Sequence, residues 1–214
     1  MLKRLETPRA GRLAILALAL LLAACGGDDG ASSFAGTVAV GAGVAGASVT
    51  VKQANGVQHA LVSDAEGRFA GEWRQVTPAM IECRGGTAAG QPNGLVLHAF
   101  VAGGATLNCT PLTELLAWRR FGMSPAQAFA RFDTALATGA ADNTSAEASV
   151  LIALAELAGA YFDADRIPRD WATRTLRAGD AADDHDVALH SVAEVIEGRQ
   201  AALDMLGELI LAPN

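Results

Sequence analysis

The chain has 214 residues, of which 51% are hydrophobic, 18% are charged and only 5% are aromatic. This length and composition suit one or two small globular domains. The formal net charge of −7 has the wrong sign for binding nucleic acid or for direct adsorption to anionic lipid.

Residues 1–24 have the form of a cleaved export signal. Four basic residues lie within the first 12, and an uninterrupted apolar run follows at residues 13–24. This run is too short to span a membrane as a helix but is typical of a leader. Removing residues 1–24 takes four basic residues and one acid with it, so the formal charge of the remaining chain is −10.

The leader ends in Leu22-Ala23-Ala24-Cys25, which resembles the lipobox of bacterial lipoproteins. The resemblance implies that Cys25 carries a diacylglycerol and further acyl chains such as palmitate, since one chain alone binds a membrane only marginally. Gly26 rather than Asp follows the cysteine, which in enterobacterial lipoproteins implies the outer membrane. The alternative is an ordinary signal peptide with a chance cysteine. No cofactor other than this covalent lipid is expected.

Residues 25–33 comprise this cysteine and a short polar tether, and the β-rich texture begins at Phe34. Residues 34–109 are rich in Gly, Val and Thr with period-2 alternation and frequent turns, which predicts an antiparallel β-sandwich of about seven short strands. Asn55-Gly56 is a hairpin signal between two such strands.

Cys83 and Cys109 are the two remaining cysteines. In an oxidising compartment this pair predicts a disulfide. The alternative is two buried free thiols.

Residues 110–214 are predicted to form an all-α region of about five helices. In the first, Thr110 is the expected N-cap, Pro111 the first helical residue and Gly122 the end. The other helices are expected over residues 124–137, 144–162, 168–179 and from 183 onward, with Gly198 as a possible break. The expected fold class is therefore α+β in two parts, which should pack together because no linker separates them.

Residues 36–71 resemble carboxypeptidase-regulatory-like, or transthyretin-like, β-sandwich modules. Asp64, Gly67 and Phe69 carry the resemblance: the carboxylate can accept from backbone amides, the glycine can take a positive φ, and the ring re-enters the core. Residues 108–113, Asn-Cys-Thr-Pro-Leu-Thr, look like the link to a helical region in bacterial lipoproteins of unknown function. Both resemblances imply architecture and location but no activity.

The sequence contains no zinc-peptidase motif, and His59 and His98 are expected to be surface or half-buried imidazoles. The densest polar cluster spans residues 180–194, where Asp186, His190 and Glu194 share a helical face. These three side chains could bind a divalent ion weakly. Helix capping and a solvated face explain them better, so no metal site and no catalytic residue is predicted.

The expected function is therefore a non-catalytic binding or structural role in the bacterial envelope. The protein is expected to contact the membrane through its lipid anchor. The candidate partners are envelope polysaccharide, peptidoglycan and another envelope protein. Nucleic acid is excluded as a partner. The alternative is a periplasmic hydrolase or metal-dependent accessory protein that uses residues 180–194.

Overall fold

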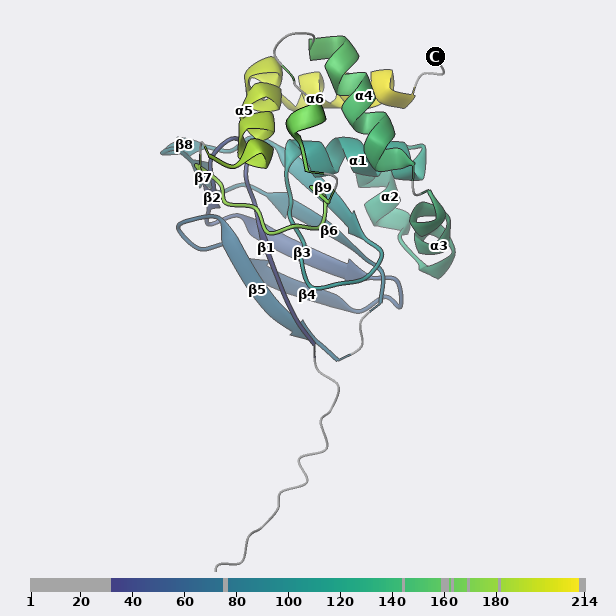
Figure 1. The fold of residues 1–214 in the computed structure, drawn as a ribbon. Coiled ribbons are helices and arrows are strands. Elements are labelled where there is room, and N and C mark those ends of the chain that lie inside the picture. Colours follow the sequence, from purple (N-terminus) through teal and green to yellow (C-terminus); the bar gives the residue numbers. More distant parts are fainter. Residues whose placement is uncertain are drawn as a thin grey trace, which may run out of the picture.

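A computed structural model describes residues 32–74, 77–143, 145–158, 162, 164–168, 170–180 and 182–211. The predicted leader, Cys25 and most of the tether lie outside the described residues. The described chain has an α+β fold, with antiparallel sheets in its N-terminal part and six α-helices in its C-terminal part (Figure 1). This fold class confirms the α+β prediction.

The N-terminal part has nine described strands in three sheets, which is two more strands than predicted. Six strands have five or six residues: β1(Ser32–Thr37), β3(Ser48–Gln53), β4(Gln58–Val62), β5(Arg68–Trp73), β6(Ala79–Arg84) and β9(Val96–Val101). Strand β1 begins at Ser32, within the predicted tether and before the predicted start of the β region at Phe34. The others have two residues each: β2(Val44–Ala45), β7(Thr87–Ala88) and β8(Gln91–Pro92). The sheet orders are β1-β5, β2-β7-β8 and β4-β3-β6-β9.

Two turns predicted from the sequence are present, one at Asn55-Gly56 and one at residues 64–67. Gly56 has φ +88° between β3 and β4, which pair as a hairpin. Asp64 Oδ1 accepts hydrogen bonds from the backbone N–H groups of Glu66 and Arg68, and Gly67 has φ +81°. Phe69 then enters the core with 4% exposure.

The four-stranded sheet is covered on one face and in part on the other. Val49, Val51 and Ile81 project from one face into the large core, which Phe34 and Trp73 of β1 and β5 also enter. Side chains alternate across a strand, so Met80, His98 and Phe100 project from the other face. Met80 and Phe100 pack with helical residues in a second apolar cluster. His98 on that second face is buried with them, whereas Ser48, Gln58 and Arg84 on the same face are exposed.

The helices are α1(Pro111–Phe121), α2(Pro125–Arg131), α3(Thr134–Asp142), α4(Ala146–Ala158), α5(Asp184–Ile196) and α6(Gln200–Leu211). Helix α1 has the predicted ends: Thr110 Oγ1 accepts from the Thr113 N–H, Pro111 begins the helix, and Gly122 ends it with φ +65°. Helices α4, α5 and α6 gather at one end of the molecule, and α1 lies between them and the strands (Figure 1).

Two helix predictions need correction, and one predicted break is confirmed. Residues 124–137 form two helices, because Asp133 starts α3 by accepting the Leu136 N–H on its side chain. The described residues 170–179 form turns and irregular backbone where a helix was predicted. Glu197 and Gly198 both have positive φ and divide the predicted last helix into α5 and α6, at the glycine that the sequence marks as a break.

One apolar core joins the strands to the helices. It runs from Phe34 and Val49 through Leu112 and Leu115 of α1 to Leu189 of α5. This packing agrees with the expectation drawn from the absence of a linker. Within the described ranges, no helix has the length and apolar character needed to cross a bilayer.

Candidate functional site

The outer edge of β9 is covered by helical side chains. Strand β9 pairs with β6 on one side only, so its outward backbone groups need other partners. The Val96 N–H donates to Gln200 Oε1 of α6 over 2.9 Å, and the His98 N–H donates to Glu114 Oε2 of α1. Thr113 Oγ1 lies 3.2 Å from the His98 carbonyl oxygen. Two helices thus supply the partners that a neighbouring strand would give.

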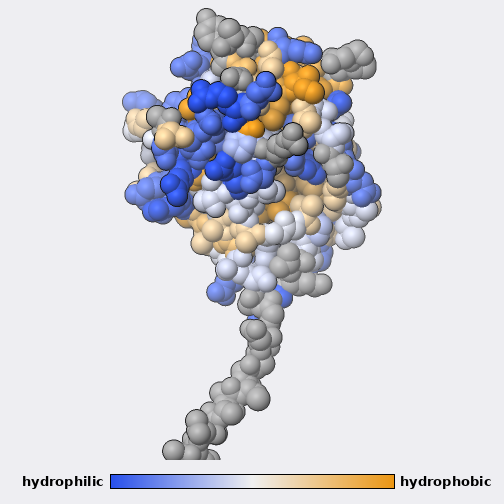
Figure 2. All heavy atoms as spheres, in the orientation of Figure 1, coloured by the Kyte–Doolittle hydropathy of each residue, from blue (hydrophilic) through white to orange (hydrophobic). Residues whose placement is uncertain are grey.

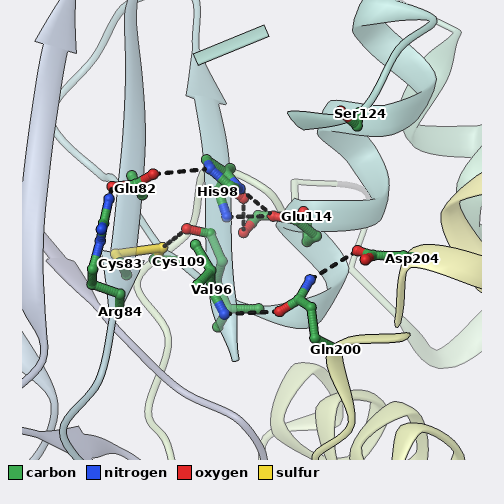
Figure 3. Close-up of polar contacts among 12 residues, drawn as sticks. Glu82, Cys83, Arg84, Val96, His98, Cys109, Glu114, Ser124, Gln200 and Asp204 are labelled. Carbon is green, nitrogen blue, oxygen red and sulfur yellow. Dashed lines mark hydrogen bonds and ion pairs between the residues drawn. A yellow bond between two sulfur atoms is a disulfide. The ribbon is translucent and has the colours of Figure 1, made fainter. Parts of the chain in front are cut away.

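The His98 imidazole lies between two carboxylates (Figure 3). Its Nδ1 is 2.9 Å from Glu114 Oε2, and its Nε2 is 3.5 Å from an oxygen of Glu82, the residue opposite it on β6. His98 is 1% exposed and Glu114 is 2% exposed. The prediction of a surface or half-buried His98 is therefore wrong, because α1 covers this face of the sheet. His59 is half-buried, as predicted.

Glu114 is the most strongly desolvated acid of this group. Burial raises the pKa of Glu114, the hydrogen bonds from His98 act in the opposite direction, and the negative charge of Asp204 raises it further. Both hydrogen bonds to Glu114 end on Oε2, so Oε1 accepts none from the described residues. Glu114 Oε1 is not among the fully buried atoms that lack a partner, and Glu114 lines a cavity. A group in that cavity can therefore donate to this oxygen, which marks the atom as a candidate ligand contact.

Glu114 lines a cavity of about 400 Å³ beside β9, which we call the β9 pocket. Figure 3 shows Glu114 between His98 and Asp204, with Gln200 below them. Gln200 Nε2 donates to Asp204 Oδ1 over 2.8 Å and so fixes the orientation of that carboxylate. The pocket is lined by Val96, His98, Glu114, Trp118, Ser124, Pro125, Ala126, Gln200, Asp204 and Glu208.

A disulfide joins Cys83 to Cys109, as predicted. The Cα atoms are 6.5 Å apart, which is within the usual range for the bond. Cys83 follows Glu82 on β6, and Cys109 precedes Thr110, the N-cap of α1. The bond therefore ties together the two elements that hold the carboxylates on either side of His98.

The predicted polar cluster on α5 is only partly assembled. Asp186 is 1% exposed, and its Oδ1 accepts from the Gly179 N–H over 3.1 Å. His190 Nδ1 lies 3.5 Å from Asp186 Oδ2, whereas Glu194 is exposed. Burial raises the pKa of Asp186, and the Gly179 hydrogen bond acts against this rise. Asp186 thus holds the preceding turn to the start of α5.

No group of three or more His, Cys, Asp or Glu side chains converges as a metal site in the part of the chain that the structure describes. The weak candidates Asp186, His190 and Glu194 are included in those residues. The pair Asp186 and His190 by itself supplies too few ligands for a closed metal site.

A second, apolar cavity lies between α4, α5 and α6. It has about 120 Å³ and is lined by Leu154, Leu157, Phe162, Ser191, Val192, Val195 and Leu206. Figure 2 shows hydrophobic side chains gathered at this helical end of the molecule. Ligand pockets are usually about 300–1,000 Å³, so this cavity is too small for most ligands.

The acidic side chains that line the β9 pocket, Glu114, Asp204 and Glu208, are hydrogen-bond acceptors when ionised. The Trp118 Nε1–H is a donor that has no hydrogen-bond partner among the described residues. Among the described residues, the hydrogen bond and ion pairs of the His98 imidazole ring join it to carboxylates and not to a hydroxyl or thiol. Ser124 Oγ accepts from the Gln127 N–H as the N-cap of α2. Carboxylates of this kind can accept hydrogen bonds from a group placed in the cavity.

Sequence reasoning did not single out the carboxylates of this site. One signal was present: His98 alternates with Val96 and Phe100, so it belongs to a covered strand face. Glu114 gave a second signal, since it stands among leucines in α1.

No protein-family model matches this chain, and no curated protein or solved structure matches it. The site must therefore be interpreted from its own residues.

Proposed function

We propose that this protein is a lipoprotein of the bacterial outer membrane with a non-catalytic binding role, and that the β9 pocket is its binding site. The observation that carries the binding role is the buried Glu114, which lines a cavity of ligand size and has one oxygen that accepts no hydrogen bond from the described residues. An unsatisfied polar group in a pocket fixes the orientation of a ligand that can satisfy it.

The lipid anchor is supported by the sequence alone, through the leader and the Leu22–Cys25 motif. Ser32 begins β1 at the end of the molecule away from α4, α5 and α6 (Figure 1). The chain between Cys25 and Ser32 reaches about 25 Å at full extension. An anchored protein would therefore hold its strand end near the membrane and its helices away from it.

We also propose that the N-terminal strands form a sandwich of the carboxypeptidase-regulatory-like kind. In this proposal the β1-β5 pair is one layer and the β4-β3-β6-β9 sheet is the other. Support comes from the Phe34 and Trp73 rings, whose centroids are 4.7 Å apart in the core that Val49 and Val51 also enter.

The binding role can be tested by blocking the pocket. Ala126 lines it from the exposed side of α2, so Ala126→Trp should fill it with little effect on the core. Ala130 is exposed on the same helix but does not line the pocket, which makes Ala130→Trp the matched control. Soluble protein starting at Gly26 is incubated with periplasmic extract, and retained small molecules are identified by mass spectrometry.

We expect the wild type and Ala130→Trp to retain the same compound and Ala126→Trp to lose it. Retention of nothing by the wild type, or equal retention by all three proteins, would overturn the binding role. The anchor is tested separately: Cys25→Ser should abolish acyl labelling in the native host, and continued labelling would contradict the lipobox interpretation.

A further inference from the structure

We propose that the β9 pocket binds a small organic cation, with a primary ammonium or guanidinium group carried on a short apolar stem. This inference rests on the proposed binding role and names the class of ligand. It follows from the charge, the unsatisfied acceptor and the apolar walls of the pocket, which are argued in turn below.

The charge of the pocket is negative and uncompensated. Glu114, Asp204 and Glu208 line it, and no lysine or arginine is among its lining residues. His98 is the one basic side chain there, and both of its ring nitrogens face glutamates. Like charges gathered in a cleft with low-dielectric walls raise the local concentration of the opposite charge.

Glu114 supplies the specific contact. Its side chain is 2% exposed, so its ionised form receives little help from water. His98 satisfies only Oε2, and Oε1 has no donor among the described residues. An ammonium or guanidinium group brings both the missing donor and the missing positive charge, and such charge-assisted bonds are about twice as strong as neutral ones.

The remaining walls suit a carbon stem. Val96, Trp118, Pro125 and Ala126 line the same cavity, and an indole ring also attracts a cation close to its face. The indole of Trp118 is held in place by Gly207, because a Cβ on Gly207 would overlap the ring. The volume of about 400 Å³ is at the small end for ligand pockets, which favours a compact amine over a polymer chain.

The spacing of the carboxylates favours an organic cation over a metal ion. A metal needs several ligand atoms within about 2.0–2.6 Å of one point, and the acids of the β9 pocket do not form such a group among the described residues. An organic cation spreads its donors over several ångströms and can reach carboxylates that stand apart.

The test uses three probes of equal carbon length and different charge. Cadaverine (1,5-diaminopentane) is the cation, 1,5-pentanediol is neutral and glutarate is the anion. Isothermal titration of the soluble protein from Gly26 at low ionic strength should give the tightest binding for cadaverine. Glu114→Gln should weaken cadaverine binding about tenfold or more, which is the value of one charged hydrogen bond.

Two further variants keep the test decisive. Asp204→Asn changes a half-buried residue and retains the oxygen that accepts from Gln200, so it should fold and still weaken cadaverine binding severalfold. Glu156→Gln removes the same charge from an exposed position on α4 outside the pocket and should change binding less than twofold.

Tighter binding of the diol or glutarate than of cadaverine would overturn the cation inference. Equal loss in Glu156→Gln would show a general charge effect and would also overturn it. If the Ala126→Trp experiment identifies a neutral or anionic compound, the binding role stands and the cation inference fails. If no compound is retained and no probe binds, both fail.

Discussion

His98 and His185 are both buried, but their surroundings are opposite. His98 lies between β9 and α1 with carboxylates facing both ring nitrogens. His185, in the first turn of α5, is 0% exposed and neither of its ring nitrogens has a hydrogen-bond partner among the described residues. Its ring lies edge-on to Trp171, with centroids 6.0 Å apart.

His98 belongs to a polar site, whereas His185 belongs to an apolar contact. Burial lowers the pKa of His185 to about 4, with the nearby charges of Asp183, Arg174 and Asp170 as smaller influences. His185 is therefore neutral at ordinary pH and acts as part of the core around Trp171. The sheet region instead gathers charges around its histidine, and a cavity opens beside them. The predictions below test this contrast, from the largest expected effect to the smallest.

Removing the Glu114 carboxylate beside His98 should lower the free energy of unfolding by the largest amount. Glu114→Leu leaves the His98 N–H and Nδ1 without their shared acceptor, and breaking a buried pair from one side lowers the free energy of unfolding by about 3–5 kcal/mol. Urea unfolding at pH 7 measures the change. Glu114→Gln keeps an accepting oxygen and should lower the free energy of unfolding much less. A loss below about 1 kcal/mol in Glu114→Leu would show that His98 does not depend on this acceptor.

Removing the disulfide should have the next largest effect on the free energy of unfolding. Cys83 and Cys109 are 26 residues apart, and closing a loop of this size stabilises by about 3–4 kcal/mol. The double variant Cys83→Ala, Cys109→Ala should lose this amount in urea unfolding, and reduction of the wild type is the matched comparison. Because residues 110–214 hold no cysteine, an unchanged midpoint would mean that the helical region alone determines unfolding.

His185 should destabilise the protein in acid. The unfolded chain takes up a proton near pH 6.5, whereas the folded chain resists it until pH about 4. Stability is therefore complete above pH 6.5 and falls as the pH drops towards 4, by about 3 kcal/mol in total. His185→Phe should remove this part of the pH dependence, which urea unfolding from pH 7 to pH 4 measures.

His185→Leu serves as the control for side-chain size. It also cannot take up a proton, so it should flatten the pH dependence equally even if it lowers stability at pH 7. If both variants lose stability towards acid as steeply as the wild type, His185 is not the residue that senses the pH.

Two glycines allow the smallest effects to be compared. Gly207→Ala would push α6 away from the Trp118 ring of α1 and should lower stability by about 1–3 kcal/mol. Gly139 lies in α3 with open space around it, so Gly139→Ala should raise stability by up to about 1 kcal/mol. Thermal unfolding compares them, and changes of the same sign would contradict the tight packing at Gly207.

Much of the fold could be predicted because its signals are local. The alternation of apolar and polar residues predicted the region of the six longer strands, and Thr110 with Pro111 predicted the start of α1. The helix predicted over residues 168–179 is absent from the described residues 170–179, because distant side chains hydrogen-bond to carbonyl groups there. Asn108 Nδ2 donates to the Arg174 carbonyl over 2.6 Å, and Thr37 Oγ1 donates to the Leu176 carbonyl over 3.4 Å. These contacts replace the helical bonds that the local pattern favours.

The site could be predicted only in part for a related reason. The position of His98 on a covered strand face follows from alternation, but its carboxylates come from β6 and α1. Asp204 and Gln200 come from α6, about 100 residues further along the chain. Local periodicity contains no information on which helix will reach a strand edge.

The hydrogen bond from Val96 to Gln200 has a consequence for folding. The two residues are 104 positions apart, and contacts between such distant residues form slowly because a long loop must close first. Until α6 docks, the edge of β9 presents an unpaired backbone N–H that can pair with another chain. Folding intermediates should therefore aggregate through β9, and a chaperone that shields this edge would protect them.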